Sequence, residues 1–407
     1  MERGFARLTI TPKAERSLRA GHPWVYGEEI LSVEGSYTQG GIVDVVSRKG
    51  KWLGSGVAND QSKIRVRILS RNTNDRFDEA FFLRRIRYAL DYRRSVMGAD
   101  YACCRLIFGE ADQFPGLTVD RFGDVLVTEV LSLGMDLRKD MLYRLLLRVL
   151  EEQGERISVI YERSDSPLRA KEGLEPYAGY VSLPGLRTEG IGHTEITENG
   201  IRYDVDYVNG QKTGYFLDQK YNRQSAARLA SGKRVLDCFT HTGAFALNCA
   251  FAGAKHVTAV DISQEALDQA KRNAALNGLE ARIDFLRADV FDLLTKTAEE
   301  KQSPWEYIIL DPPAFTKSSA TADRAYKGYK EINRRAMQLL PRGGYLATCS
   351  CSHFMPAIRF EGMLREAASD AQVSLRQIEA RQQAPDHPIL WGVPETDYLK
   401  FYLFQVV

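Results

Sequence analysis

The sequence predicts an α/β protein whose C-terminal part forms a doubly wound, Rossmann-like sheet. From Val235 onward, short apolar runs alternate with longer segments of helical periodicity, which is typical of strand–helix–strand units in a parallel sheet. Ahead of that region, residues 1–72 contain closely spaced short strands and turns, and residues 73–190 mix strands with helices. We therefore expect a small β domain, a central α+β domain and a C-terminal domain over residues 191–407.

The first segment, residues 1–72, is expected to form a small β-barrel. Apolar and polar residues alternate over Ile42–Val46, Trp52–Val57 and Ile64–Leu69, and a short helix is expected at Lys13–Ala20. The segment holds twelve Lys and Arg against seven Asp and Glu. This local excess of positive charge favours an RNA-binding module, although a mildly basic structural domain has the same composition.

The central segment, residues 73–190, begins with an amphipathic helix predicted over Asp78–Ser95. Arg84 and Arg85 on this helix are candidates for phosphate contacts, with a solvated face as the alternative. The other elements predicted here are the strands Leu117–Asp120, Val125–Leu131 and Ile157–Tyr161 and the helix Asp136–Glu152. These patterns do not indicate what the central domain does.

The C-terminal segment opens with a hairpin expected over residues 195–208, because Asn199-Gly200 is a type I′ turn between two alternating runs. The final run, Leu399–Val407, is predicted to be a long edge strand. The elements predicted between them are Arg234–Cys238, Thr242–Ala254, His256–Val260, Ser263–Leu279, Ile283–Leu286, Tyr307–Leu310 and Gly344–Thr348.

An acidic residue stands at the end of each of three successive predicted strands: Asp237, Asp261 and Asp289. The carboxyl ends of parallel strands are where open α/β sheets bind ligands, and such acids accept hydrogen bonds from ribose hydroxyls or an amino group. The loop after the first strand has a single glycine, Gly243, so it is not the Gly-x-Gly-x-x-Gly loop of pyrophosphate binding. A helix-capping role explains each acid singly, but three in succession favour a nucleotide-like ligand without a pyrophosphate.

A carboxylate and two thiols follow the next two predicted strands. Asp311-Pro312-Pro313 comes after Tyr307–Leu310, and Cys349 and Cys351 come at the end of the Gly344–Thr348 run. A thiolate adds to electron-poor rings, and a nearby carboxylate can hydrogen-bond the ring as charge develops. Cys351 is the first candidate nucleophile and Cys349 the second, against the alternative that each is a small buried hydrophobe. His353 is a candidate for lowering the thiol pKa, or for capping the next helix.

Composition narrows the class of protein. The 407 residues carry a net charge of +2, with 44% hydrophobic and 27% charged residues, as in ordinary globular chains. No apolar run approaches the roughly 20 residues needed to cross a bilayer, and the N-terminus lacks the apolar core of a signal peptide, so we expect a cytoplasmic protein without membrane contact. Six cysteines without Cys-x-x-Cys spacing predict neither a metal site nor a disulfide framework.

These features together resemble the class I S-adenosylmethionine-dependent methyltransferases. More narrowly, essentially the whole chain is similar to the bacterial large-subunit (23S) rRNA cytosine-C5 methyltransferases that carry an N-terminal PUA domain. The segments that carry the resemblance are Gly21-His22-Pro23-Trp24, Phe114–Leu117, the Gly210-Gln211-Lys212-Thr213-Gly214 block with its continuation to Gln219, the acids named above and Ser350-Cys351-Ser352.

The resemblance implies S-adenosylmethionine as cofactor, and 23S rRNA or a large-subunit precursor as partner. The implied catalytic residues are Cys351 and Asp311. The residues expected to bind the cofactor are Phe216, Gln219, Arg223, Asp237, Phe239, Gly243, Asp261, Ile262, Ser263, Asn277, Asp289, Val290 and Asp311. The residues expected to contact RNA are Lys212, His22, Trp24, Arg84 and Arg85. The oligomeric state stays open, with a homodimer among the options.

One departure from the family pattern leaves one catalytic role without a candidate residue. Better-known RNA cytosine-C5 methyltransferases carry a second cysteine beside the Asp-Pro-Pro position for product release, whereas this chain has Pro312 and Pro313 there. The group that removes the C5 proton is therefore not identified. Three alternatives remain: methylation of an amino group (guanine N2 or adenine N6), which needs no thiol, a non-catalytic RNA-binding assembly factor, and methylation of a lysine or glutamine of a protein.

Overall fold

The computed structural model describes residues 3–300, 303–316 and 318–407, which fold into two compact units. Unit 1 comprises the chain as far as Glu195 together with Val205–Leu217 and Pro385–Thr396. Unit 2 comprises Ile196–Asp204, Asp218–Ala384 and Asp397–Val407. None of the helices in the described ranges is both long enough and apolar enough to cross a bilayer.

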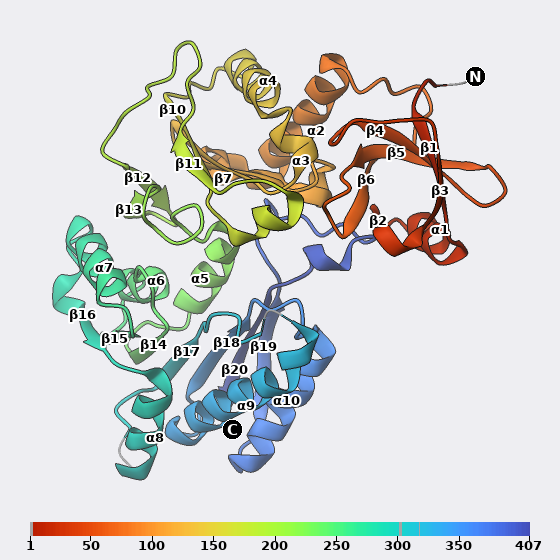
Figure 1. The fold of residues 1–407 in the computed structure, drawn as a ribbon. Helices are drawn as coiled ribbons and strands as arrows, with labels where there is room; N and C mark the ends of the chain where they lie inside the picture. Colours follow the sequence, from red (N-terminus) through yellow and green to blue (C-terminus); the bar gives the residue numbers. More distant parts are fainter. Residues whose placement is uncertain (1–2, 301–302, 317) are drawn as a thin grey trace. The chain divides into compact units, whose positions relative to one another are not determined.

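The N-terminal part of unit 1 is a six-stranded sheet in the order β2-β6-β5-β4-β1-β3 (Figure 1). Its elements are β1 (Ala6–Ile10), α1 (Pro12–Arg19), β2 (Trp24–Tyr26), β3 (Ile30–Glu34), β4 (Ile42–Val46), β5 (Trp52–Ala58) and β6 (Ile64–Ser70). Side chains of β1 and of β4–β6 form its core with α1. The three strands and the helix predicted here are confirmed to within a residue or two. β1, β2 and β3 were not predicted, and Trp24 is the first residue of β2.

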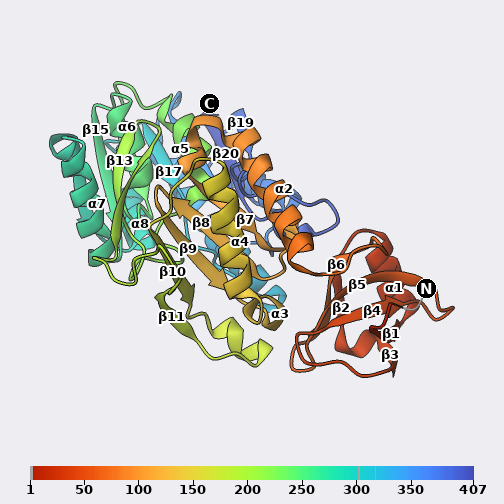
Figure 2. The same cartoon turned by 90° about the horizontal axis from the view of Figure 1, so that it is seen from above.

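The rest of unit 1 is built on a five-stranded sheet in the order β11-β10-β9-β8-β7. Helices α2 and α4 pack against each other, and Figure 2 shows them lying over this sheet. The elements are α2 (Glu79–Met97), β7 (Cys103–Phe108), β8 (Leu117–Phe122), β9 (Val125–Val130), α3 (Leu133–Asp136), α4 (Lys139–Glu152), β10 (Val159–Ser164) and β11 (Tyr177–Tyr180). The predicted strands and helices agree with the structure to within three residues, whereas β7, α3 and β11 were not predicted. Asp78 caps α2 through a hydrogen bond from the Phe81 amide.

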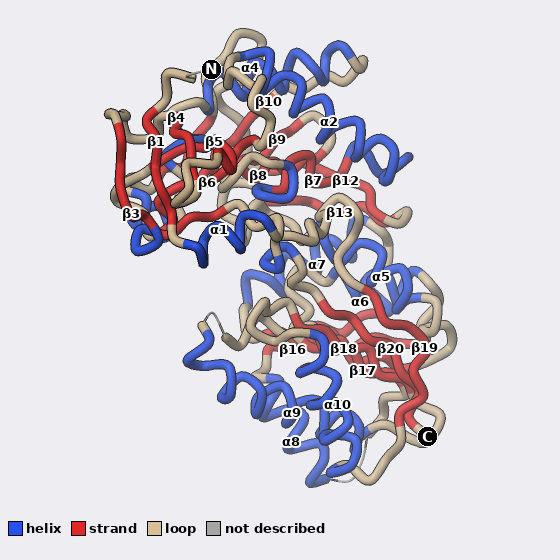
Figure 3. The backbone as a smooth tube through the Cα atoms, turned by 90° about the vertical axis from the view of Figure 1, so that its right-hand side faces the viewer, coloured by secondary structure: helices blue, strands red, loops and turns tan. Residues whose placement is uncertain are grey.

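Unit 2 contains a seven-stranded sheet in the order β16-β15-β14-β17-β18-β20-β19. The first five strands in this order are parallel, and β20 and β19 complete the sheet in antiparallel pairs. In Figure 3, α8, α9 and α10 cover one face of this sheet, while α5, α6 and α7 lie on the other. The predicted doubly wound α/β fold is confirmed.

The elements of the C-terminal half are β12 (His193–Glu198), β13 (Ile201–Asp206), α5 (Lys220–Ala227), β14 (Arg234–Cys238), α6 (Ala244–Phe251), β15 (His256–Asp261), α7 (Gln264–Leu276), β16 (Ile283–Arg287), α8 (Val290–Glu300), β17 (Tyr307–Leu310), α9 (Ala322–Leu339), β18 (Tyr345–Ser350), α10 (Ala357–Asp370), β19 (Leu375–Arg381) and β20 (Lys400–Val406). Asn199 and Gly200 have positive φ values of 54° and 79° in the turn between β12 and β13, as that turn type requires.

One prediction about the sheet is wrong: β20 is not an edge strand. It pairs with β18 on one side and with β19 on the other, and six of its seven residues are buried. The edge strand on this side of the sheet is β19, which was not predicted because its residues are mostly polar and exposed. An apolar run buried on both faces belongs inside a sheet, so the composition of β20 already favoured an interior position.

Candidate active site

The site lies where the order of strands in the unit 2 sheet reverses. β14 is followed by β15 and β16 on one side, and the chain then returns to place β17 and β18 on the other. In open α/β sheets this switch point leaves a crevice at the carboxyl ends of the two central strands, here β14 and β17. A pocket of about 810 Å³ lies at the opposite edge, where the lining residues Arg234, Trp305 and Pro341 adjoin strand beginnings, and we assign it no role.

Asp237 in β14 is fully buried at this switch point. Its Oδ2 accepts hydrogen bonds from the Thr240 hydroxyl at 2.5 Å and from the Ala246 amide at 2.9 Å. Its Oδ1 has no hydrogen-bond partner among the residues that the structure describes. Burial raises the pKa of Asp237 to about 7, and the negative charges of Asp311 and Asp261 add to this rise. A buried oxygen without a donor marks a place for a ligand that brings one.

The loop that follows β14 has an unusual backbone. Phe239 and His241 have φ values of 63° and 51°, a region that non-glycine residues rarely adopt. Gly243 has φ of 84°, and a Cβ there would lie 2.9 Å from the Cβ of Ala270, so glycine is required. The turn brings the Thr240 hydroxyl to Asp237 and starts α6 at Ala244. Such strain is typical of ligand-binding loops.

The next two acids also lie at this edge, but each already accepts backbone hydrogen bonds. Asp261 accepts from the His241 and Ser263 amides, both at 2.9 Å. It thereby ties the loop after β14 to the end of β15. Asp289 is exposed and accepts from the amides of Phe291 at 2.8 Å and Asp292 at 3.3 Å, which begins α8. Capping roles and ligand roles are compatible here, since a carboxylate can accept about four hydrogen bonds.

Asp311 is surrounded by groups that fix its orientation. Its Oδ1 accepts a hydrogen bond from Gln219 Nε2 at 3.0 Å. Burial raises the pKa of Asp311 to about 6, the charge of Asp218 raises it further, and Arg223 and Gln219 oppose the rise. Cys349 hydrogen-bonds Asp311 and is fully buried, and burial followed by the Asp311 charge raises the pKa of its thiol well above the ordinary value. Cys349 is thus a poor nucleophile at neutral pH.

Cys351 lies one residue beyond the end of β18 and is partly exposed, whereas the other five cysteines are buried. Its thiol donates to the Pro312 carbonyl at 3.9 Å, which places it beside the Asp-Pro-Pro segment as predicted. The neighbouring Ser352 hydroxyl donates to the Thr316 carbonyl at 3.2 Å. His353 is exposed, and Pro356 occupies the N-cap position of α10, so His353 does not cap that helix.

Arg223, expected to bind the cofactor, is already paired on one side. Its guanidinium forms two hydrogen bonds with Glu198 of β12, at 2.8 and 3.1 Å, and both side chains are buried. The charge of Arg223 nevertheless acts on Asp311 and His241, which places it at the same edge. Its role toward a cofactor stays a prediction, and Glu198 is a partner that the sequence did not indicate.

Three further residues of unit 2 and one of unit 1 are expected to bind the cofactor, and that role stays a prediction. Asn277 ends α7, which starts at the carboxyl edge and runs away from it for about 20 Å. Its side chain bonds the backbone of Arg202 in β13. Ile262 is 64% exposed, and Val290 is packed in the core at the start of α8. Phe216 belongs to unit 1, where the Lys212 ammonium lies 5.0 Å from its ring centroid.

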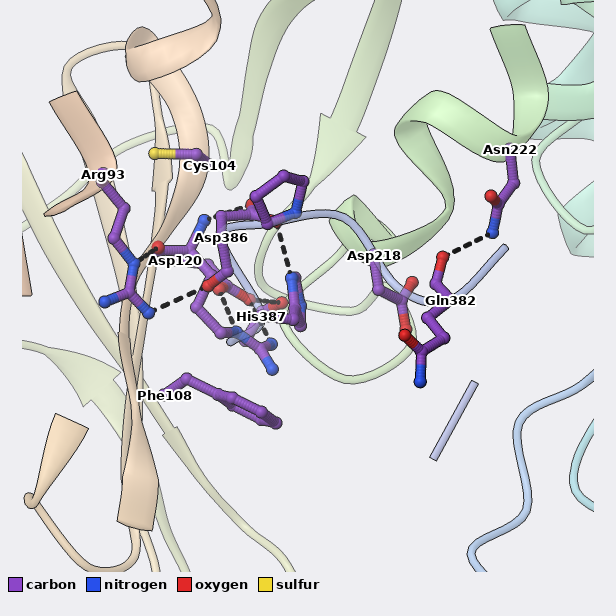
Figure 4. A network of polar contacts seen from close by, with 12 residues as sticks. Arg93, Cys104, Phe108, Asp120, Asp218, Asn222, Gln382, Asp386 and His387 are labelled. Atoms are coloured by element: carbon purple, nitrogen blue, oxygen red, sulfur yellow. Dashed lines mark hydrogen bonds and ion pairs between the residues drawn. The ribbon is translucent and has the colours of Figure 1, made fainter. Parts of the chain in front are cut away.

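The Gly-Gln-Lys-Thr-Gly block is fixed to the central sheet of unit 1. The Thr213 hydroxyl donates to Asp120 Oδ2 at 2.6 Å, and Arg105 forms a bidentate pair with the same carboxylate at 2.7 and 2.8 Å. Burial raises the pKa of Asp120, but Arg105 more than offsets this and holds it low. The Arg105 amide also donates to Asp386 at 2.9 Å, and Figure 4 shows Asp120 and Asp386 within this network.

The residues expected to touch RNA have internal partners in the structure. His22 Nε2 lies 3.3 Å from Glu395, and Trp24 Nε1 donates to Glu110 at 3.0 Å. Arg84 pairs with Asp75 at 2.7 Å, and Arg85 donates to the Leu69 carbonyl at 2.8 Å. Burial lowers the pKa of Arg85 to about 10. Their contact with RNA stays a prediction.

The residues at the carboxyl edge fit S-adenosylmethionine as a group. A carboxylate with an unpaired oxygen, a second acid at the end of β15 and a glycine-dependent turn suit its amino, ribose and adenosine parts. Within the described ranges, no three His, Cys, Asp or Glu side chains are grouped to hold a metal ion. Gln219 and Arg223 both act on Asp311, and their contact with the methionine part stays a prediction.

Comparisons with known proteins agree with this arrangement. Residues 177–405 match the family model described as S-adenosylmethionine-dependent methyltransferase, and residues 8–71 match a PUA-like domain. A protein of Klebsiella pneumoniae named ribosomal RNA large subunit methyltransferase I is 39% identical, covering 99% of both chains. A protein of the same name from Shewanella denitrificans is 42% identical, covering 98% of this chain and 99% of its own.

Solved structures show the same fold. A putative S-adenosylmethionine-dependent methyltransferase from Streptococcus mutans superposes with a TM-score of 0.81 at 21% identity, covering 98% of this chain and 100% of that one. A putative methyltransferase solved in complex with SAH superposes with a TM-score of 0.82, also at 21% identity and with the same coverage. At this identity the likeness concerns the fold.

Proposed function

Because this chain belongs to the family of S-adenosylmethionine-dependent methyltransferases, we propose that it methylates large-subunit ribosomal RNA at C5 of a cytosine. The RNA class is supported by full-length relatives named ribosomal RNA large subunit methyltransferase I and by the PUA-like match. The target atom is supported by one observation above all. Cys351, the partly exposed thiol, lies against the Asp-Pro-Pro segment at the carboxyl edge of the sheet.

In the proposed reaction the Cys351 thiolate forms a bond to C6 of the cytosine, and the π electrons of the C5–C6 bond move to C5. When bound, S-adenosylmethionine supplies the methyl group that C5 takes up. The C5 proton is then lost to water, the sulfur–C6 bond breaks, and its electrons leave with the thiolate as the C5–C6 double bond is restored. Covalent addition makes C5 nucleophilic, which cytosine alone does not offer.

Asp311 is proposed to hydrogen-bond N3 or the exocyclic amine of the cytosine as charge develops. Its pKa, raised to about 6 mainly by burial, makes the carboxyl a better proton donor near neutral pH than an ordinary aspartate. Gln219 holds one oxygen of this carboxyl at 3.0 Å and so fixes its direction. Pro312 and Pro313 have no amide N–H, so the segment offers carbonyl oxygens and one carboxyl to a flat base.

The reaction product distinguishes this proposal from methylation of an amino group. The enzyme should be incubated with unmodified 23S rRNA and labelled S-adenosylmethionine, and the digested nucleosides identified by mass spectrometry. We expect 5-methylcytidine. Labelled N2-methylguanosine or N6-methyladenosine would favour the amino-group alternative, and no labelled nucleoside would favour a binding factor.

The RNA-contacting surface of unit 1 is proposed to include Trp391. This side chain is 93% exposed and stands on a turn closed by the Val393 amide and the Leu390 carbonyl at 2.7 Å. The next residue, Gly392, packs so closely on Gly21 of the PUA-like segment that a Cβ would lie 2.8 Å from its backbone. Whereas His22 and Trp24 are internally engaged, Trp391 offers a free ring face for stacking on a base.

Replacing Trp391 by alanine is therefore expected to weaken binding of single-stranded RNA by about tenfold, since a stacked base contributes roughly 1–3 kcal/mol. Trp391→Phe should restore most of the affinity, and the dependence on salt should not change, because no phosphate contact is lost. Fluorescence anisotropy at two salt concentrations measures both. Leu137→Ala, at a side chain that is 61% exposed in the same unit, is the matched control. Equal affinities for Trp391→Ala and wild type would contradict the assignment.

A further inference from the structure

Lys400 is a buried cation next to the segment that carries Cys351. It begins β20 and pairs with Ser350, the last residue of β18. Lys400 is only 5% exposed, and its Nζ donates to the carbonyl oxygens of Ser352 and Tyr398, both at 2.7 Å. Burial lowers the pKa of Lys400 to about 8, and the charges of Asp397 and Cys351 partly offset that fall. The side chain is thus still mainly an ammonium at neutral pH.

This ammonium forms no salt bridge with any carboxylate in the parts of the chain that the structure describes. Buried charges normally face a charge of opposite sign, and two neutral carbonyl oxygens do not supply one. Asp397 acts on Lys400 but is exposed, so water screens it. Cys351 is the other group whose negative charge acts on Lys400, and it directly precedes Ser352.

Three nearby groups, Tyr329, Asp311 and Cys349, disfavour the thiolate form of Cys351 because each becomes negative when it ionises. Burial and then the charge of Cys351 raise the pKa of Tyr329, which means that these two groups disfavour ionising together. Asp311 and Cys349 lie nearby and become negative, not positive, when they ionise. His353 is exposed and stacks edge-on with Phe354, at 5.5 Å between ring centroids. Lys400, by contrast, is a buried cation bonded to the backbone of the residue after Cys351.

We propose that Lys400 is a positioning residue that keeps Cys351 in its thiolate form and holds the segment after β18 in place. The inference rests on the proposed function, in which this thiolate adds to C6. The thiol proton passes to solvent and Lys400 stays protonated, so no proton moves between the two. The two hydrogen bonds fix the ammonium on the backbone carbonyls of Ser352, which directly follows Cys351, and of Tyr398.

The test measures the pKa of the Cys351 thiol without RNA or cofactor. Iodoacetamide alkylation of Cys351 is followed by peptide mass spectrometry from pH 5.5 to pH 9.5, in the full-length wild type and in Lys400→Met, Lys400→Gln and Lys400→Arg. We expect a wild-type midpoint clearly below the ordinary value of about 8.5. Loss of the charge should raise the midpoint by about one unit and slow alkylation at pH 7 about tenfold. Arginine should largely retain the wild-type midpoint.

A structural role alone would leave the midpoint unchanged, so equal midpoints in the four proteins would overturn the inference. If circular dichroism shows that the uncharged variants do not fold, the wild-type midpoint decides: a value at or above about 8.5 would overturn it. The experiment also distinguishes a failure of the role of Lys400 from a failure of the proposed cytosine-C5 function. A shifted thiol pKa without 5-methylcytidine formation would overturn the cytosine-C5 function alone. Formation of 5-methylcytidine with equal midpoints would overturn the role of Lys400 alone.

Discussion

Cys351→Ala is expected to lose methyl transfer almost completely, with kcat/KM falling by about 10⁴-fold or more. Without the thiol no bond to C6 forms, and C5 of cytosine does not attack a methyl donor at a useful rate. Cofactor binding should change less than threefold, since Cys351 is not among the groups that fit the cofactor. A filter-binding assay with labelled S-adenosylmethionine and 23S rRNA measures the rate, and calorimetry measures the affinity.

Cys349→Ala is the matched control, because this cysteine lies two residues earlier and faces Asp311. Removing a buried sulfur leaves a small cavity, which costs about 1–2 kcal/mol of stability. Activity should fall less than about tenfold, because burial keeps the Cys349 thiol protonated. If Cys351→Ala retained turnover and Cys349→Ala did not, the two thiols would exchange roles. Retained turnover in both would leave amino-group methylation as the better account.

Asp237→Asn is expected to weaken S-adenosylmethionine binding by about 30- to 100-fold, which corresponds to the roughly 2–3 kcal/mol of one hydrogen bond to a charged group. In the variant, the asparagine NH₂ group takes the place of Oδ1, which has no hydrogen-bond partner within the described part of the chain. The NH₂ group is a donor, so it cannot accept the hydrogen bond that the ligand donates to Oδ1. Calorimetry of the full-length protein measures the affinity. Asp289→Asn, which changes an exposed helix cap, should lose clearly less affinity for S-adenosylmethionine than Asp237→Asn. An affinity of Asp237→Asn within threefold of wild type would remove Asp237 from the site.

The same variant should change how stability depends on pH. The folded pKa of Asp237 is about 7, well above an ordinary aspartate in the unfolded chain at about 3.9. Between these values the folded protein holds the proton more tightly, so wild-type stability falls as pH rises from about 4 to about 7. Asp237→Asn lacks this component. Urea unfolding at pH 5 and pH 7.5 should show a smaller loss of free energy for the variant than for wild type, and equal losses would contradict the raised pKa.

The strands predicted most accurately are those whose own residues determine them. β4, β14 and β17 were predicted to the residue, because each is a short apolar or alternating run bounded by turn or polar residues. β19 could not be predicted in this way, since its residues are mainly polar and its strand character comes from pairing with β20. The position of β20 inside the sheet depends on that same pairing, which no local pattern contains.

The residues of the candidate site also fall into two groups, those that local sequence predicts and those contributed by distant segments of the chain. Asp237, Asp261 and Asp311 could be named from sequence because each directly follows a strand core, and parallel strands end at one edge. Glu198 and Lys400 could not, because they reach the site from segments distant in the chain. Glu198 is 25 positions from its partner Arg223, and Lys400 is 48 positions from Ser352. The cofactor role of Asn277, which caps the C-terminal end of α7 and bonds the backbone of Arg202, stays a prediction.

The central claim is that Cys351 forms a covalent bond to C6 of the target cytosine, and trapping of that adduct tests it most directly. RNA containing 5-fluorocytosine is incubated with the enzyme and S-adenosylmethionine, since fluorine at C5 cannot leave as a proton and the adduct persists. We expect a complex stable to denaturant, whose nucleotide-bearing peptide contains Cys351 by mass spectrometry. Methyl transfer to ordinary rRNA without any such complex, or an adduct on Cys349, would contradict the claim.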